Sequence, residues 1–273
     1  MPAEPVPNLS AYILTCNNEE TLAGALRSVS DLAEEIVVVD SGSKDSTLDI
    51  AKQYTDRIIH QPWQGFRDQY QFAQDQCRGE WVIFLDADEE LSPQLGEEIR
   101  LELARNQQRP SHAQIAGYRI PRRTFFLDRW ILHGAWSSDQ EIRLYKKTLG
   151  RWEGGLHACV HIHDGAVATL RNFYYHFSYR NISEQIEKLN HYSTETAKEA
   201  CSLGKTSIMN VISHPIWRFI KDYFLKAGFL DGMPGLVIAV NDAWYTFNKY
   251  AKSWELAYCQ EERIKKIRDE ERP

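Results

Sequence analysis

The sequence predicts an α/β protein in which helices flank a mostly parallel β-sheet and a helical, aromatic-rich region follows at the C-terminus. Three observations predict this fold class. From Leu9 to about Asp88, apolar segments typical of strands alternate with segments whose apolar residues follow helical spacing. Residues 117–179 are rich in strand-like patterns, and the chain becomes helical from about Asn181. Alternating strands and helices form a parallel sheet because each helix returns the chain to the same end of the sheet.

Each element of the first part is predicted by a local pattern. Asn17 and Glu20 have the spacing of a capping box, which predicts a helix beginning at Asn17. Further helices are predicted around Leu48–Tyr54 and from about Gly65 to Gln76. The buried strands that alternate with them are predicted at 11–15 (AYILT), 36–39 (IVVV), 57–60 and 81–85 (WVIFL).

The later elements follow similar signals. Ser92 before Pro93 is a favourable helix start, because serine caps the helix and proline suits its first turn. His214–Pro215 predicts the start of a late helix. We expect residues 1–105 and 106–180 to be two halves of one α/β domain, with 181–273 as a helical region.

Composition narrows the class of protein. The 273 residues are 43% hydrophobic and 26% charged, which is enough apolar material for a sizeable core. A formal net charge of −6 argues against a nucleic-acid partner. The five cysteines include no CxxC pair, which favours a cytoplasmic protein with reduced thiols over a disulfide or zinc framework. No signal peptide and no uninterrupted run of 18 apolar residues is present, so no membrane-spanning helix is predicted.

Aromatic residues are concentrated near the C-terminus. Residues 214–258 hold 11 of the chain's 32 aromatic side chains in 45 positions, about twice their share. Trp217 and Phe224 lie close to Arg218 and Lys221, a combination typical of helices in a membrane interface. The segment predicts peripheral contact with the inner face of the cytoplasmic membrane or with a lipid-linked ligand. Contact with a second subunit and internal packing are the alternatives.

Polar side chains follow three predicted strands at the point where each strand ends. Asn17, Asp40 and Asp86 occupy these positions, and parallel sheets bind ligands at the carboxyl ends of their strands. Asp86 and Asp88 form a D-x-D pair whose hard oxygen ligands suit Mg²⁺ or Mn²⁺, and an acidic turn in water is the alternative. The loop after Asp40 contains Gly42, which lets the backbone approach a base or ribose.

Four motifs together resemble family 2 glycosyltransferases, which are inverting enzymes with the GT-A fold, a Rossmann-like arrangement. They are YILTCNNEETL, EEIVVVDSGSKDST, WQGFRDQYQFA and GEWVIFLDADE, over about the first 95 residues. Beyond them, SSDQEIRLYKK, WEGGLH and PIWRFIKDYFLKAGFLDGMPGL are similar to a narrower subgroup that includes the bacterial lipopolysaccharide core β-1,4-glucosyltransferases.

The resemblance implies that residues 1–105 are the nucleotide-sugar-binding half and residues 106–180 the acceptor and catalytic half of the α/β domain. It also implies a role for each residue of the motifs. The nucleotide sugar would be held by residues of the first four motifs: Thr15, Asn17, Glu19, Asp40, Gly42, Arg67 and Asp86. Asp88 would bind the Mg²⁺ or Mn²⁺ ion directly, together with Asp86. Glu89 would face the donor sugar or the acceptor. Trp63 and Trp136 are candidates for stacking on a sugar ring, with packing as the alternative.

The catalytic base and a third metal ligand lie in the later motifs. Inversion needs a carboxylate that takes the proton of the acceptor hydroxyl. Asp139 is the first candidate and Glu141 the second, since a regular strand puts both on one face. His157 occupies the family's histidine position, although relatives carry His-Glu where this chain reads His157-Ala158. A structural histidine is the alternative for His157.

The sequence therefore predicts a metal-dependent hexosyltransferase. The donor would be a nucleotide sugar, UDP-glucose first, and the acceptor a surface glycan or glycolipid such as a lipopolysaccharide core. An oligomer is compatible with these features. The alternatives are a sugar nucleotidyltransferase, which the lack of Gly, Lys or Arg after Thr15 disfavours, and a nucleotide-sugar-binding protein without activity.

Overall fold

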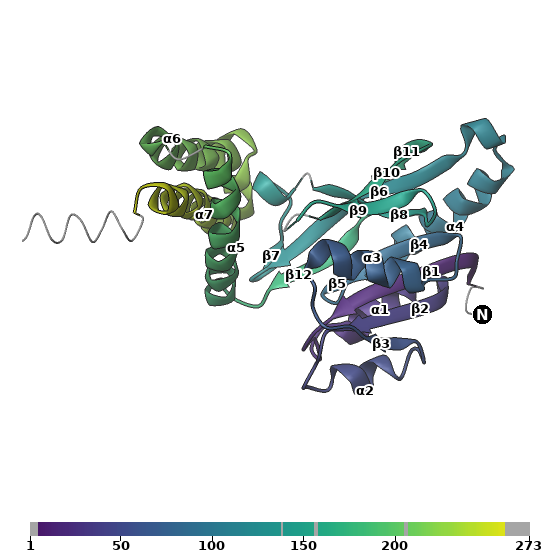
Figure 1. The fold of residues 1–273 in the computed structure, drawn as a ribbon. Coiled ribbons are helices and arrows are strands. Elements are labelled where there is room, and N and C mark those ends of the chain that lie inside the picture. The colour runs from purple at the N-terminus through teal and green to yellow at the C-terminus, as the bar shows by residue number, and fades with distance from the viewer. Residues whose placement is uncertain (1–4, 138, 156–157, 205–206, 260–273) are drawn as a thin grey trace, which may run out of the picture. The chain divides into compact units, whose positions relative to one another are not determined.

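In the computed structural model, the alternating segments of the first part form the parallel portion of a large sheet (Figure 1). The structure describes residues 5–137, 139–155, 158–204 and 207–259. Neighbouring strands follow the order β3-β2-β1-β4: β1 (Val6–Thr15), β2 (Ala33–Asp40), β3 (Ile58–His60) and β4 (Trp81–Asp86). They are connected by α1 (Leu22–Ser30), α2 (Thr47–Ala51) and α3 (Phe66–Gln76). The predicted strand–helix alternation is confirmed.

An antiparallel portion continues the sheet beyond β4. From β4 the order runs through β8 (Gln140–Lys146), β6 (Ile115–Phe126), β12 (Tyr174–Tyr179) and β5 (Glu89–Leu91). The remaining elements of this part are α4 (Pro93–Gln108), a 3-10 turn (Ser111–Ala113), β11 (Ala166–Thr169) beside β6, and the pair β9 (Gly150–Glu153) and β10 (Cys159–Ile162). The predicted strand-rich stretch is confirmed.

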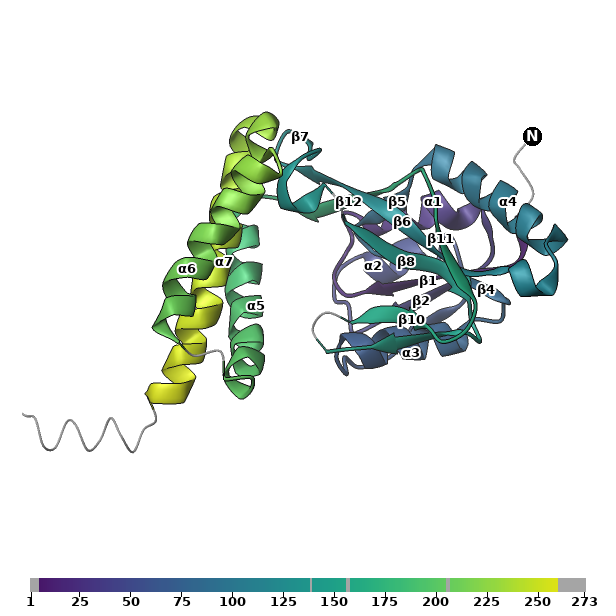
Figure 2. The ribbon, with the colours of Figure 1, turned by 90° about the horizontal axis from the view of Figure 1, so that it is seen from above.

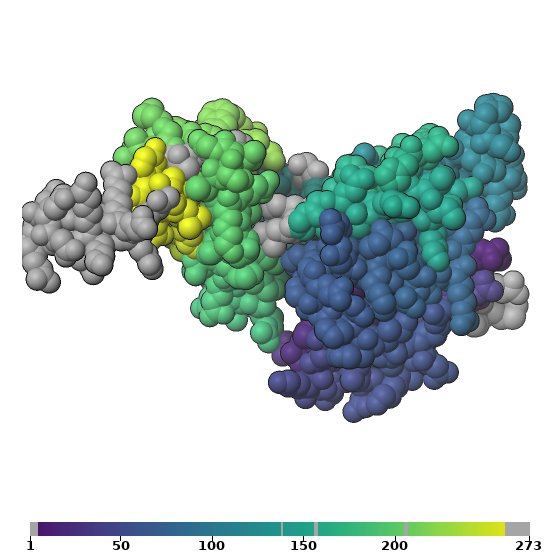
Figure 3. All heavy atoms as spheres, in the orientation of Figure 1, coloured from purple at the N-terminus to yellow at the C-terminus, as the bar shows by residue number. Residues whose placement is uncertain are grey.

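Two apolar cores lie on opposite faces of the sheet. Along β1, Leu9, Ala11 and Ile13 face one core, while Tyr12 and Leu14 face the other. Helices α1 and α4 cover the first core, and α3 covers the second. Figure 3 shows the segment around β9 and β10 lying directly against α3, although some 80 residues of chain separate them. Because both faces are covered, the ends of the strands provide a rigid base for a site.

The chain divides into two compact units. The first comprises residues 1–125 and 138–178, and the second comprises 126–137 and 179–273. The boundary near 178 is close to the one expected at 180. Residues 126–137, expected in the acceptor half, belong instead to the helical unit. They do so because the buried Asp231 accepts hydrogen bonds from the backbone N–H groups of Leu132 and His133, at 3.1 and 2.7 Å.

The second unit is mainly helical, as predicted from about Asn181 onward. In Figure 2, α7 (Gly232–Tyr258) lies between α5 (Ile182–Ser202) and α6 (Ile208–Phe219), and packs against both. A π-helical turn (Ile220–Leu225) and a 3-10 turn (Gly228–Asp231) join α6 to α7. The inserted segment contributes β7 (Arg129–Trp130) and a 3-10 turn (Gly134–Trp136).

Two predicted helix starts are wrong, and a third is right. Helix α1 begins at Leu22 rather than after Asn17, because Asn17 has a φ of +55° and its side-chain oxygen accepts a hydrogen bond from another loop. Helix α6 begins at Ile208, where Ser207 caps it, so Pro215 lies inside the helix. Helix α4 starts as predicted, with Ser92 Oγ accepting from Leu95 N at 3.2 Å.

Candidate active site

The ends of three parallel strands lie at one level on the sheet edge. In the register of β1, Leu14 is the partner of Asp86 on β4, and Thr15 is the partner of Asp40 on β2. The structure therefore brings Thr15, Asp40 and Asp86 to the same edge. A ligand placed there would meet side chains from three strands and from the loops that follow them.

Asp40 shapes the loop that follows β2. Its side chain is 2% exposed and accepts hydrogen bonds from the N–H groups of Gly42, at 2.9 Å, and Ser43, at 3.1 Å. Gly42 has a φ of +109°, which only glycine adopts without strain. The loop backbone is thereby held in one conformation beside the strand ends. Its contact with a nucleoside stays a prediction.

The loop after β1 is tied to the loop after β2. Asn17 Oδ1 accepts from Lys44 N at 2.8 Å, and Glu19 Oε2 accepts from Ser46 N at 3.0 Å. Thr15 Oγ1 donates to Asn18 Oδ1 at 3.1 Å. The predicted nucleoside ligands thus also have a structural task, since they form one double loop. Their role toward a donor is not tested by these contacts.

Two further predicted donor-side residues are exposed. Arg67, in the first turn of α3, is 54% exposed and pairs with its neighbour Asp68 at 2.8 Å. Trp63 is 49% exposed and packs edge-on against Phe66, with ring centroids 4.8 Å apart. Both side chains are accessible to a ligand.

Asp86 ends β4 in a half-buried position. The hydroxyl group of Tyr70 donates a hydrogen bond to Asp86 Oδ1, and Asp86 N donates to Glu89 Oε2 at 2.9 Å. Burial raises the pKa of Asp86; Arg143 opposes this rise and Asp88 adds to it. A divalent cation would relieve the repulsion between the two aspartates.

His176 lies beside Asp88, although the sequence did not single it out. Strand β12 pairs antiparallel with β5, so that His176 is opposite Glu89, and Phe177 N donates to Asp88 O at 2.9 Å. His176 Nε2 is 3.6 Å from Asp88 Oδ2, and the two side chains are 15% and 26% exposed. The buried Nδ1 of His176 has no hydrogen-bond partner among the described residues. The sequence signal that could have pointed to His176 is the segment YYHFSY, which contains this histidine.

Arg143 joins the acidic cluster to strand β8. Its guanidinium group makes a bidentate contact with Glu89, at 2.6 and 3.1 Å, and lies 2.7 Å from Glu141 and 4.0 Å from Asp86. The register between β6 and β8 shifts at Arg143, which has no partner on β6. Such an irregularity re-aims a side chain, and here it directs the arginine toward the cluster.

Arg143 affects the pKa values of the carboxyl groups around it. Its positive charge is the main cause that lowers the pKa of Glu141, so Glu141 is a carboxylate at neutral pH. Glu89 is 1% exposed, and burial raises its pKa to about 7, against the opposing effect of Arg143. The buried Glu89 carboxylate is therefore already paired with Arg143. Its contact with a sugar stays a prediction.

The two candidate bases are held by different arginines. Asp139 pairs with Arg122 and is 38% exposed, whereas Glu141 pairs with Arg143 and is 40% exposed. Both carboxylates are accessible, and only Glu141 shares an arginine with Asp86 and Glu89. The structure is therefore compatible with either Asp139 or Glu141 as the catalytic base.

Two other predicted site residues have different outcomes. His157 lies outside the described residues. Trp136 belongs to the second unit, where it packs against Phe126 and Tyr179, with ring centroids 5.5 and 6.0 Å away. Packing accounts for the position of Trp136, and sugar stacking by it stays a prediction.

The donor set at the strand ends fits a hard divalent cation. Within the described parts of the chain, no three histidine, cysteine, aspartate or glutamate side chains form a ready-made metal centre. Asp86 nevertheless ends β4, Asp88 lies in the turn that follows, and His176 approaches Asp88 from β12, so that two carboxylates and an imidazole lie near this strand end. Mg²⁺ and Mn²⁺ accept such an incomplete set, because water and substrate phosphate supply further ligands.

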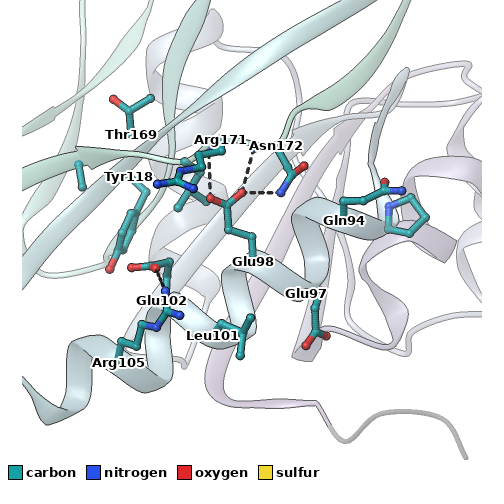
Figure 4. A pocket seen from close by; sticks show the side chains of 13 residues that line it. Gln94, Glu97, Glu98, Leu101, Glu102, Arg105, Tyr118, Thr169, Arg171 and Asn172 are labelled. Carbon is teal, nitrogen blue, oxygen red and sulfur yellow. Dashed lines mark hydrogen bonds and ion pairs between the residues drawn. The ribbon is translucent and has the colours of Figure 1, made fainter.

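A hollow lies elsewhere on the first unit. It has a volume of about 970 Å³, is bounded by α4 and residues 168–172, and contains none of the predicted site residues (Figure 4). Glu98 accepts there from the N–H groups of Arg171 and Asn172, at 2.9 and 2.8 Å. The Glu98 carboxylate thus stabilises the turn after β11.

Comparison with known proteins identifies the family of this chain. Residues 10–166 match the model of glycosyl transferase family 2. The lipopolysaccharide core biosynthesis glycosyltransferase LpsC of Rhizobium meliloti is 32% identical over 257 residues, covering 90% of this chain and 92% of LpsC. A glycosyltransferase of Rickettsia typhi is 31% identical over 259 residues, covering 91% of this chain and 87% of that protein.

Among solved structures, S. aureus TarS in complex with UDP-GlcNAc resembles this chain with a TM-score of 0.45 and 15% identity, over 94% of this chain and 91% of that one. The mixed sheet flanked by helices is the GT-A fold expected from the sequence. The family match extends over more than half of the chain. The protein is thus a glycosyltransferase and belongs to glycosyl transferase family 2.

Proposed function

We propose that this glycosyltransferase is metal-dependent and inverting, and that it moves a hexose from a nucleotide sugar to a cell-surface glycan. UDP-glucose is the first donor to test, and a lipopolysaccharide core is the first acceptor class, as the name of the relative LpsC suggests. The observation that carries the proposal is that Asp40 and the Asp86–Asp88 pair stand at the ends of the two strands that flank β1, at one sheet edge.

Named residues would divide the work of donor binding. The double loop of Asn17, Glu19 and Asp40 offers fixed backbone groups to the nucleoside. Asp86, Asp88 and His176 would hold a Mg²⁺ or Mn²⁺ ion. When bound, such an ion neutralises the diphosphate of the donor and of the leaving group.

The transfer step requires one base and one leaving group. The acceptor oxygen forms a bond to the anomeric carbon while the bond from that carbon to the diphosphate oxygen breaks. The acceptor proton passes to the carboxylate of Asp139 or Glu141. Arg143 keeps Glu141 ionised and oriented, whereas Arg122 pairs with Asp139. Attack from the face opposite the leaving group gives inversion.

The purified full chain can test the proposal directly. We expect one nucleotide sugar in a panel to raise the melting temperature with Mn²⁺ and to do so less without it. The same donor should release a nucleoside diphosphate with Mn²⁺. Stabilisation without release would favour a binding protein, and formation of a nucleotide sugar from a nucleoside triphosphate and a sugar phosphate would favour a nucleotidyltransferase.

We also propose a cytoplasmic location for this reaction. All five cysteines are free thiols, a state that persists in a reducing compartment. A disulfide found in protein isolated from cells under alkylating conditions would contradict this location.

A further inference from the structure

Helix α6 has an apolar face that no part of the described chain covers. None of its twelve residues is buried. Seven apolar side chains on α6 and the π-helical turn are exposed by 37–65%; this α6 stripe consists of Ile208, Met209, Ile212, Ile216, Trp217, Ile220 and Phe224. Five of them follow a spacing of four residues, which places them along one face of the helix. An uncovered apolar face of this size marks an interaction surface.

Helix α7 carries a second apolar stripe. Met233, Val240, Trp244, Phe247 and Trp254 are separated by seven, four, three and seven residues, which is the spacing of one helical face. Their exposed fractions run from 36% at Trp244 to 68% at Met233. The exposed apolar surface of the second unit is therefore not confined to one helix.

Charge in this region is distributed in an unusual way. Residues 200–254 contain three acidic residues, Asp222, Asp231 and Asp242, and these are 2%, 4% and 7% exposed. Arg218 pairs with Asp222 and, at 2.9 Å, with Asp242. Asp231 accepts hydrogen bonds from residues of the inserted segment. Between residues 207 and 254, the surface is consequently apolar and cationic, with no exposed carboxylate.

The cations of this region remain near the surface. Lys221 is exposed beside Phe224, and Lys226 is 35% exposed at 4.0 Å from the buried Asp222. Aromatic side chains flanked by lysine and lacking nearby acids suit the headgroup region of an anionic bilayer. A symmetric contact with a second copy would instead bring together two copies of this surface, which offers no exposed carboxylate between residues 207 and 254 to pair with Lys221. The charge pattern thus selects lipid over self-association.

We propose that α6 and the π-helical turn lie in the plane of an anionic phospholipid membrane, with the α6 stripe inserted at the interface. No single described helix is long and apolar enough to cross a bilayer. Residues 208–225 and 228–258 meet the length and composition of a span only as a pair, bent by 70°. A helix lying in the interface accommodates this bend and keeps Lys221 at the headgroups. The inference does not depend on the donor, the acceptor or the metal.

Flotation of the full chain with vesicles tests this proposal. We expect binding to vesicles of phosphatidylcholine with phosphatidylglycerol, and weaker binding to phosphatidylcholine alone or in 1 M salt. The double substitution Ile216→Gln and Phe224→Gln should lower the partition coefficient about tenfold or more. Leu101→Gln is the matched control, because Leu101 is 48% exposed on α4 of the first unit and should not change binding.

Two outcomes of flotation would overturn the proposal. One is equal binding by the double variant and the wild type. The other is that the wild-type protein stays at the bottom of the gradient and elutes as a dimer in size-exclusion chromatography, whereas the double variant elutes as a monomer. Retention in the pellet after an alkaline carbonate wash would also contradict an in-plane position, since it requires a spanning insertion.

Trp217 gives a second readout, which begins with the wild-type protein and uses only a conservative substitution. Brominated lipids should quench wild-type tryptophan fluorescence, and Trp217→Phe should remove most of that quenching. Trp63→Phe is the control, because Trp63 is exposed to a similar extent on the first unit, 49% against 58% for Trp217. Equal quenching in wild type and Trp217→Phe would place the α6 stripe outside the lipid. Donor hydrolysis without vesicles should be unchanged in Trp217→Phe, which separates this test from that of the proposed function.

Discussion

At the scale of single residues, the site depends on one buried arginine. Arg143 is 3% exposed, contacts Glu89 and Glu141, and lies over the rings of Phe84 and Tyr174 at 4.2 and 4.7 Å. A charge in this position is tolerated because two carboxylates and two aromatic faces surround it. Arg143 thus lowers the pKa of Glu141 and opposes the rise that burial causes in the pKa of Glu89 and Asp86.

The D-x-D pair supports a prediction at this scale. Asp88→Asn keeps the side-chain shape but removes the charge that a cation needs. We expect the release of nucleoside diphosphate to fall by about 10² or more and the half-saturating Mn²⁺ concentration to rise. Release measured over a Mn²⁺ titration checks this. Asp128→Asn, at a site 66% exposed in the second unit, is the control. Wild-type behaviour of Asp88→Asn would remove Asp88 from the metal site.

The identity of the base is a second prediction. Asp139→Asn and Glu141→Gln each remove one candidate carboxylate, and we expect the variant that lacks the base to lose about 10² to 10⁴ in kcat. Its affinity for the donor should be nearly unchanged, because the base acts on the acceptor. Parallel measurement of turnover and of donor-induced thermal stabilisation checks this. If both variants keep full turnover, neither residue is the base.

At the scale of elements, pairing between distant strands completes the site. Strand β12 lies beside β5 and so brings His176 to Asp88, although 88 positions separate the two in the chain. Strand β8 brings Arg143 beside β4 in a similar way. The β4–β8 pairing joins the antiparallel portion of the sheet to the parallel one, and the β5–β12 pairing lies within the antiparallel portion. The candidate site lies where the two portions meet.

Glu35 on β2 gives a prediction about stability. Burial by itself raises its pKa, but hydrogen bonds from Ser10 Oγ, at 2.6 Å, and Arg78 N, at 2.8 Å, together with the charge of Arg57, lower that pKa on balance. A lowered pKa in the folded state contributes stability above the unfolded pKa of about 4.3, and the contribution is lost as the pH falls through the folded value. We expect Glu35→Gln to reduce the free energy of unfolding at pH 7 by about 1–3 kcal/mol.

Denaturant unfolding at pH 7 and at pH 3.5 would measure this effect. The difference between wild type and Glu35→Gln should shrink at the lower pH, because the carboxylate is then increasingly protonated in both states. Glu34→Gln is the matched control on the neighbouring position, whose side chain is exposed. A difference that stays constant or grows on acidification would contradict this account of Glu35.

At the scale of the whole molecule, the chain has two units with separate tasks. The described residues predicted to hold the donor and the metal belong to the first unit, and the exposed apolar stripes belong to the second. The buried Asp231 fastens residues 126–137 to the helices of the second unit. The chain therefore passes between the units more than once, which does not follow from a simple division at residue 180.

Hydrogen exchange can test this division of tasks. With Mn²⁺ and the donor, we expect amide protection at the ends of β1, β2 and β4 and in the loop of residues 41–46. Anionic vesicles alone should instead protect α6 and the π-helical turn. Mass spectrometry of peptides from the full chain checks both. Protection of α6 by the donor without vesicles, with none at the strand ends, would contradict the assignment.

The sequence by itself determined the order of strands and helices, the α/β class, the family and the acidic pair at the end of β4. These properties are local: apolar periodicity, capping residues such as Ser92 and contiguous motifs such as GEWVIFLDADE are all encoded within a few residues. The sequence failed at Asn17 and Pro215. At Asn17, a contact with a distant loop decided the backbone conformation, and at Pro215 a cap eight residues earlier extended the helix.

Only the tertiary structure decided which side chains meet. His176 joined the site through strand pairing, Arg143 through a shift of register on β8, and residues 126–137 entered the helical unit through Asp231. It also decided that the three acids of the α6–α7 region are buried and paired, which leaves an apolar and cationic surface. Such facts depend on contacts between residues far apart in the chain, and no local pattern encodes them.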